Sequence, residues 1–177
     1  MSEHIIVNWR DADDSLYRSV GQVVVHATRL EDATTIAVRH VLGIKKAAEL
    51  AGGPSSCSLK KVDAAIPFIA GFDDQFKADF SATVGKAMCL LQWRNKIVHA
   101  VYRSRSFDGT QLGWKEVRNE DSREPVEWNR EDVIGFVAES EGIADRMVHM
   151  AQRVSFRDVA QLSPEITAMP RDAFGSP

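Results

Sequence analysis

The sequence predicts an all-α protein, a bundle of about four main antiparallel helices with a small β-hairpin before the last helix. Long segments of the chain repeat apolar residues at steps of three and four, which is the period of an amphipathic α-helix. Residues 111–128 interrupt this period with a short alternating pattern and a polar turn. The chain has 177 residues, a length that favours one compact domain. We therefore expect a single helical domain over residues 1–154 and a C-terminal arm or tail over residues 155–177.

The first predicted helix spans residues 15–42, where apolar side chains recur every three or four positions. The residues at positions 13–15, Asp-Asp-Ser, offer an N-cap and negative charge for its positive end. The segment 51–56, Ala-Gly-Gly-Pro-Ser-Ser, then breaks the chain, because glycine frees the backbone and proline restricts it. A short second helix follows, with Ser58 as its cap, and Pro67 kinks or ends it.

A third long helix is predicted to begin at Asp73 and Asp74 and to carry its apolar stripe as far as Val101 or Tyr102. The helical period is lost after Arg105. Two short strands, 111–118 and 125–128, are then predicted around the polar turn 119–124. The last helix opens at Asn129, which forms a capping box with Asp132 in place of the usual Glu or Gln.

Composition and charge restrict the classes of protein to which the chain can belong. Hydrophobic residues make up 44% and charged residues 27%, which is typical of a globular protein and not of a disordered or fibrous one. The net charge is −3, so no global positive field attracts nucleic acid, and any such binding must be local. Cys57 and Cys89 stand far apart, so two reduced thiols are expected rather than a disulfide or a metal site. The sequence has neither a secretory signal nor an apolar stretch of membrane-spanning length, so we expect a cytoplasmic protein without a membrane partner.

Three side chains near the end of the third helix have the chemistry of a nuclease site: Arg94, Asn95 and His99. Asn95 and His99 are one helical turn apart and share a face, whereas Arg94 lies about 140° around the helix from His99. A long arginine side chain can still reach the same opening if the helix bends or a second subunit closes over it. The offset therefore favours a site that a second copy of the chain completes.

The sequence around these residues is a local basic stripe in an otherwise acidic protein. Residues 81–107 contain no Asp or Glu, and they include cations that we expect to bind RNA phosphates: Lys86, Lys96, Arg103 and Arg105, together with Arg94. The alternative is that Lys96, Arg103 and Arg105 are solvated charges that complement the negative end of the helix dipole. Both interpretations stay open at this stage.

The chemistry that these side chains support is metal-independent cleavage of RNA. The 2′-hydroxyl attacks the adjacent phosphorus, and the products are a 2′,3′-cyclic phosphate and a free 5′-hydroxyl. His99 suits proton transfer as a general base or acid, because an imidazole titrates near neutral pH. Arg94 suits binding of the phosphate and stabilisation of charge that develops in the transition state, and Asn95 either orients His99 or donates to a phosphate oxygen. If the site is composite across a two-fold axis, we expect one His99 to act as the base and the other as the acid.

The run Arg94-Asn95-Lys96-Ile97-Val98-His99 resembles the signature of the HEPN domain superfamily: an arginine, a polar residue directly after it, and a histidine four to six residues further on. An arginine, asparagine and histidine at this spacing arise about 0.01 times by chance in a chain of this composition. The resemblance implies a helical fold and a metal-independent endoribonuclease, an enzyme that acts on RNA as a homodimer with a composite site. It also implies a role as a toxin or antiphage effector, with a cognate antitoxin as a further partner.

Two other residues are candidate accessory groups. Tyr102 is similar to a tyrosine near the histidine of some toxin members, although it stands three positions after His99 where the family pattern has two. Glu31, in the first predicted helix, has the charge to pair with Arg94 from a neighbouring helix, but an acid at mid-helix is more often simply exposed.

Two other functions remain open from the sequence. The first is a non-catalytic HEPN-like module that binds RNA or nucleotide, or that dimerises and regulates a partner. The second is a helical scaffold in which Arg94 and His99 are buried structural hydrogen-bonding groups. No Glu-xx-His, HExxH, Walker or GxSxG motif is present, so we expect neither a metal nor a cofactor.

Overall fold

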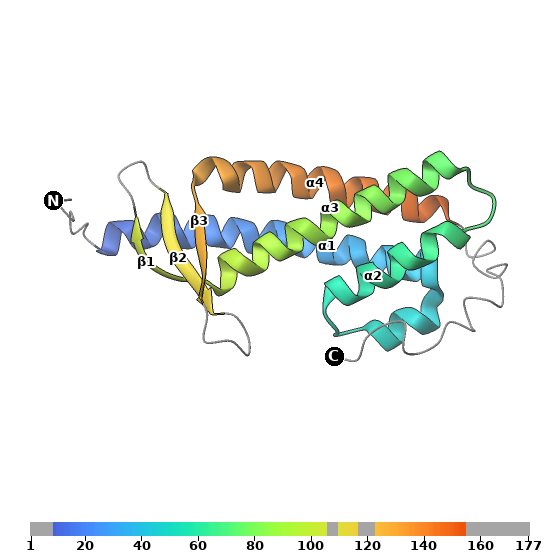
Figure 1. The fold of residues 1–177 in the computed structure, drawn as a ribbon, viewed down its shortest axis with the longest axis horizontal. Helices are drawn as coiled ribbons and strands as arrows, with labels where there is room; N and C mark the ends of the chain where they lie inside the picture. The colour runs from blue at the N-terminus through green and yellow to red at the C-terminus, as the bar shows by residue number, and fades with distance from the viewer. Residues whose placement is uncertain (1–8, 106–109, 117–122, 155–177) are drawn as a thin grey trace. The chain divides into compact units, whose positions relative to one another are not determined.

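The computed structural model describes residues 9–105, 110–116 and 123–154 (Figure 1). The elements follow in the order α1 (Trp9–Leu50), α2 (Ser55–Ala65), η1 (Ile66–Phe68), α3 (Asp74–His99), β1 (Val101–Arg105), β2 (Gln111–Glu116), β3 (Arg123–Trp128) and α4 (Arg130–Arg153). The prediction of a mostly helical protein with four main helices is confirmed. None of the helices in these ranges is long and apolar enough to cross a membrane.

The chain divides into two compact units, which we describe separately. Among the described residues, the first unit comprises residues 9–29, 89–105, 110–116 and 123–141, and the second comprises residues 30–88 and 142–154. The division into a domain at 1–154 and an arm at 155–177 stays a prediction, because residues 155–177 lie outside the described part of the chain.

Helix α1 begins earlier than the sequence predicted, at Trp9 rather than near Ser15. The prediction of a cap at positions 13–15 is therefore wrong, because these residues lie inside the helix, several positions after its start. The predicted end near Leu42 coincides with a kink at Gly43, whose φ of 84° and ψ of 165° are non-helical. Only glycine adopts this conformation readily, so Gly43 interrupts the helix before it resumes towards Leu50.

Helix α2 corrects the predicted cap at Ser58. The helix begins at Ser55, and Pro54 occupies the N-cap position without a side-chain cap bond. The backbone N–H groups of Cys57 and Ser58 donate to the Pro54 carbonyl at 3.0 and 3.4 Å, and Ser58 is buried inside the helix. The prediction for Pro67 is confirmed, because the α-helix ends at Ala65 and Pro67 lies in the 3-10 turn η1.

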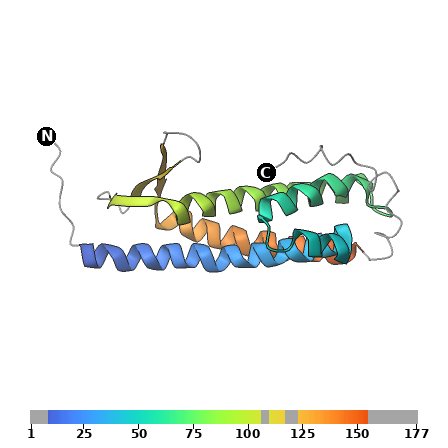
Figure 2. The same cartoon turned by 90° about the horizontal axis from the view of Figure 1, so that it is seen from below.

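Helix α3 starts where the sequence predicted and ends earlier. Asp73 caps it, because its Oδ1 accepts a hydrogen bond of 2.7 Å from the backbone N–H of Phe76. The helix stops at His99, and one residue later the chain is extended in β1, as Figure 2 shows. The apolar residues at 98 and 101 match the helical period, but Val101 belongs to a strand whose backbone pairs with β2. A pairing partner far along the chain therefore overrides the local pattern.

The strands between α3 and α4 differ from the predicted two-stranded hairpin. They form an antiparallel sheet in the order β1-β2-β3, with Val101 opposite Trp114 and Gln111 opposite Trp128. A bulge between Tyr102 and Ser104 shifts the register of β1. The strand that the sequence missed is β1.

Helix α4 confirms the predicted capping box. Asn129 Oδ1 accepts hydrogen bonds from the backbone N–H groups of Glu131 at 2.8 Å and Asp132 at 3.0 Å. In return, Asp132 Oδ2 accepts a bond of 2.7 Å from the backbone N–H of Asn129. The Asn129 side chain thus satisfies two backbone N–H groups at the helix start that would otherwise lack a partner. The Asp132 side chain in turn satisfies the backbone N–H of Asn129.

The second unit has a core of aliphatic residues and a row of phenylalanines. Phe72 stacks on Phe76 with ring centroids 4.3 Å apart, and Phe76 meets Phe80 edge to face at 6.0 Å. The guanidinium carbon of Arg153 lies 4.7 Å from the Phe76 ring centroid, which is a cation–π distance. Ser81 donates a short hydrogen bond to Asp63, which ties α3 to α2.

Candidate functional site

The predicted site lies in the first unit, where packing of α3 against α4 holds the last turns of α3 in place. Trp93 stacks on Phe136 of α4, with ring centroids 4.9 Å apart and ring planes at 25°. Leu90, Leu91 and Ile97 are buried on the same helix. Because Arg94 and Asn95 directly follow Trp93, this packing fixes the backbone from which both side chains extend.

The side chains of Arg94 and Asn95 are hydrogen-bonded to each other. Arg94 Nη1 donates to Asn95 Oδ1 at 2.8 Å, and both residues are half-buried. An arginine has only donors, so the atom of Asn95 that faces it must be the carbonyl oxygen. The sequence had predicted that Asn95 orients His99 or contacts phosphate, and this bond shows that Asn95 contacts Arg94.

His99 is exposed at the C-terminal end of α3. It shares the last turn with Lys96, which is half-buried and whose positive charge complements the negative pole of the helix dipole. An exposed imidazole can exchange protons with a bound ligand. A buried structural histidine would not have this access, so the exposure of His99 weighs against the scaffold interpretation.

The remaining predicted site residues are distributed between the two units. Tyr102, Arg103 and Arg105 belong to β1, and their side chains lie outside the described residues. Lys86 is exposed and Glu31 is half-buried, and both belong to the second unit. Within the first unit the structure therefore brings together Arg94 and Asn95, with His99 one turn further along the same helix.

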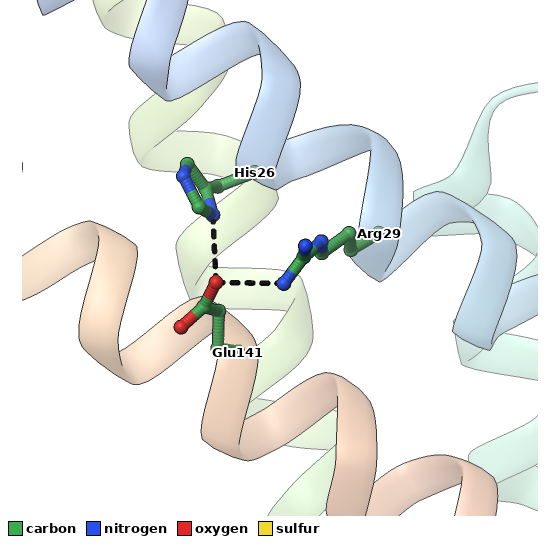
Figure 3. A network of polar contacts seen from close by, with 3 residues as sticks. All are labelled: His26, Arg29 and Glu141. Atoms are coloured by element: carbon green, nitrogen blue, oxygen red, sulfur yellow. Dashed lines mark hydrogen bonds and ion pairs between the residues drawn. The ribbon is translucent and has the colours of Figure 1, made fainter.

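A second polar cluster in the first unit was not predicted from the sequence. Figure 3 shows His26 and Arg29 of α1 facing Glu141 of α4. Arg29 Nη1 donates to Glu141 Oε1 at 2.6 Å, and His26 Nδ1 lies 3.3 Å from the same oxygen. His26 and Arg29 are three residues apart on one helix face, which a sequence can show. Glu141 is 112 residues from Arg29 along the chain, so no local pattern links it to them.

The cluster links α1 and α4 through one carboxylate oxygen of Glu141. The side chains of His26, Arg29 and Glu141 are 19%, 61% and 43% exposed, so water screens much of the attraction. The His26 Nδ1 contact with Glu141 is an ion-pair distance and not a hydrogen bond, and the neighbouring Ser140 Oγ is buried without a hydrogen-bond partner in the described part of the chain. Among the described residues, no three His, Cys, Asp or Glu side chains lie close enough together to hold a metal ion.

Comparison of the chain with protein-family models, with curated proteins and with solved structures found no match.

Proposed function

We propose that this chain is a metal-independent endoribonuclease of the HEPN type. The observation that supports it best is the arrangement at the end of α3. Arg94 is hydrogen-bonded to Asn95, and an exposed His99 stands one turn beyond Asn95 on the same helix. These groups are a donor for a phosphate and an imidazole that can transfer a proton.

In the proposed reaction, Arg94 binds the scissile phosphate and stabilises the charge that develops on its oxygens. His99 accepts the proton of the 2′-hydroxyl as this oxygen attacks phosphorus. The bond between phosphorus and the 5′-oxygen breaks, and that oxygen takes up a proton. The His99 of a second copy in a homodimer would donate it. The products are a 2′,3′-cyclic phosphate and a 5′-hydroxyl.

The test is cleavage of RNA by the purified full chain in the presence of a chelator. Wild type should cleave, and His99→Ala should lower the rate by about 10²–10⁴, as expected for loss of a general acid or base. Arg94→Ala should lower it by about 10²–10³, as expected for loss of one transition-state donor. Gln92→Ala is the matched control, because Gln92 is exposed on the same helix, and it should cleave like wild type.

Each alternative outcome has a defined meaning. A His99→Ala variant that cleaves at the wild-type rate would overturn the proposal. A folded wild type that binds RNA without cleaving it would identify a non-catalytic binding module instead. Products that carry a 2′,3′-cyclic phosphate on the upstream fragment would support attack by the 2′-hydroxyl.

The biological role that we propose is a toxin or antiphage effector restrained by a cognate antitoxin. This part of the proposal rests on the resemblance of residues 94–99 to the superfamily signature. Expression of wild type in a bacterial host should stop growth, and expression of His99→Ala to the same level should not. Equal growth with both chains would contradict a toxin role while leaving the cleavage assay to decide the chemistry.

A further inference from the structure

The positions of Arg94, Asn95 and His99 around the axis of α3 determine which of these side chains are neighbours. At about 100° per residue, Asn95 lies about 100° around the helix from Arg94, and His99 lies about 140° from Arg94 in the same direction. Asn95 therefore stands between the other two. It is also close to His99, because residues four apart on a helix face have Cβ atoms about 5–6 Å apart.

The backbone of Arg94 lies on the side of α3 that carries buried residues. Leu90 and Leu91 are 8% and 5% exposed, and on the helix circumference they lie on either side of Arg94, at about −40° and 60°. Arg94 itself is half-buried, and its Nε atom is buried, so the protein covers part of the guanidinium.

The bond to Asn95 ties the guanidinium of Arg94 to its neighbour on the helix. Arg94 Nη1 donates to Asn95 Oδ1 at 2.8 Å, so the guanidinium is held on the Asn95 side of the helix. With its oxygen towards Arg94, Asn95 turns its NH₂ group away.

We infer that Asn95 is a positioning residue that places Arg94 on the His99 face of α3, so that Arg94 and His99 of the same chain act on one phosphate. This inference rests on the proposed nuclease function. It differs from the expectation that a second subunit completes the arginine–histidine pair, because the pair is assembled within one protomer. A second copy would then supply only the second proton-transfer group.

Mixed dimers test this assignment directly. Arg94→Ala and His99→Ala chains with different affinity tags are co-expressed, and dimers that carry both tags are isolated and assayed. If the pair acts within one chain, neither chain of a mixed dimer holds a complete pair, and cleavage stays at the level of the single variants. If the pair acts between chains, the mixed dimer holds one complete arginine–histidine pair. Although it lacks the second His99, it should then cleave faster than either single-variant homodimer, which would overturn the inference.

Two further outcomes are also decisive. If the tagged chains do not associate while wild type cleaves, the site is contained in one chain, and the inference is supported. If wild type cleaves no RNA, the proposed function fails, and this result is distinct from recovery in the mixed dimer.

The positioning role of Asn95 has its own test. Asn95→Ala should lower kcat by about tenfold to a hundredfold, the size expected when a catalytic group is misplaced by about 1 Å. The pH dependence of the rate should match that of wild type, because Asn95 acts on Arg94 and not on His99.

In an Arg94→Ala background, Asn95→Ala should change the rate less than twofold. A shifted pH profile, or effects that multiply in the double variant, would show that Asn95 acts on His99 instead.

Asn95→Asp is the matched variant, because it keeps an oxygen acceptor for Arg94. It replaces the NH₂ donor with negative charge beside the phosphate, so KM should rise while the double-variant coupling to Arg94 persists. Loss of that coupling in Asn95→Asp would contradict a bond between the two side chains.

Discussion

Trp93 of α3 stacks on Phe136 of α4 with ring centroids 4.9 Å apart, and Arg94 of the candidate site is the next residue after Trp93. The stacked pair therefore connects the stability of the first unit with the position of its candidate catalytic groups.

Phe136→Ala should destabilise the protein by about 3–5 kcal/mol, because Phe136 is 4% exposed and its loss leaves a cavity beside Trp93. Chemical denaturation measures this difference. Ile134→Ala is the control on the same helix, because Ile134 is 58% exposed, and it should change the free energy of unfolding by less than about 0.5 kcal/mol. A double-variant cycle of Trp93 and Phe136 should give a coupling of about 0.5–1.5 kcal/mol. Equal effects of Phe136→Ala and Ile134→Ala would contradict the packing described here.

Two glycines of α1 should respond in opposite ways to alanine. Gly43 has a φ of 84° and a ψ of 165°, so Gly43→Ala should cost about 1–3 kcal/mol of stability. Gly21 is exposed inside the helix, and an added Cβ there meets nothing within 4 Å. Gly21→Ala should therefore stabilise by about 0.5–1 kcal/mol. Thermal unfolding of both variants checks the pair, and a destabilising Gly21→Ala would argue against a regular helix at that position.

Loss of the α4 cap should be measurable. Asn129→Ala removes the acceptor for two backbone N–H groups and should cost about 0.5–2 kcal/mol in denaturant unfolding. Asn129→Ser keeps an oxygen at the cap and should stay close to wild type. If both variants lose the same stability, the loss does not come from the cap bonds.

The Arg29–Glu141 pair should contribute little to stability despite its 2.6 Å contact. Both side chains are substantially exposed, so a double-variant cycle should give a coupling below about 1 kcal/mol. The coupling should fall as salt is raised from 0.01 to about 1 M, because the screening length shortens. Glu139→Gln serves as the control at an exposed acid of the same helix. A large, salt-independent coupling would indicate that the cluster is desolvated.

Glu49 should titrate at a lower pH in the folded protein than in a Lys46→Ala variant. The hydrogen bond from Lys46 Nζ, 2.7 Å long, lowers the pKa of Glu49, and the positive charge of Lys46 lowers it further. A lowered folded-state pKa stabilises the protein above the unfolded-state pKa, and this contribution is lost as pH falls through the folded value. NMR titration of the Glu49 carboxyl measures the shift. Identical midpoints in the two chains would show that Lys46 does not cause it.

The local physics of the chain accounts for the elements that the sequence predicted correctly. Asn129 and Asp132 satisfy each other's helix-start groups within four residues, so the beginning of α4 follows from their spacing alone. Pro67 lacks an N–H group, and the α-helix before it ends at Ala65 as that chemistry requires. Residue type and spacing along a helix also single out Arg94, Asn95 and His99, whose role in catalysis stays a prediction.

Contacts between distant residues account for the features that the sequence did not predict. The end of α3 at His99 follows from pairing of β1 with β2, a contact that the helical period of Val98 and Val101 does not reveal. Glu141 meets His26 and Arg29 only because folding brings α4 beside α1. The amino-acid order thus sets the periodicity, the caps and the chemistry of the candidate groups, because these act over a few residues. Tertiary structure decides where α3 stops and which acid of α4 meets His26 and Arg29, because both depend on residues that meet only in the folded protein.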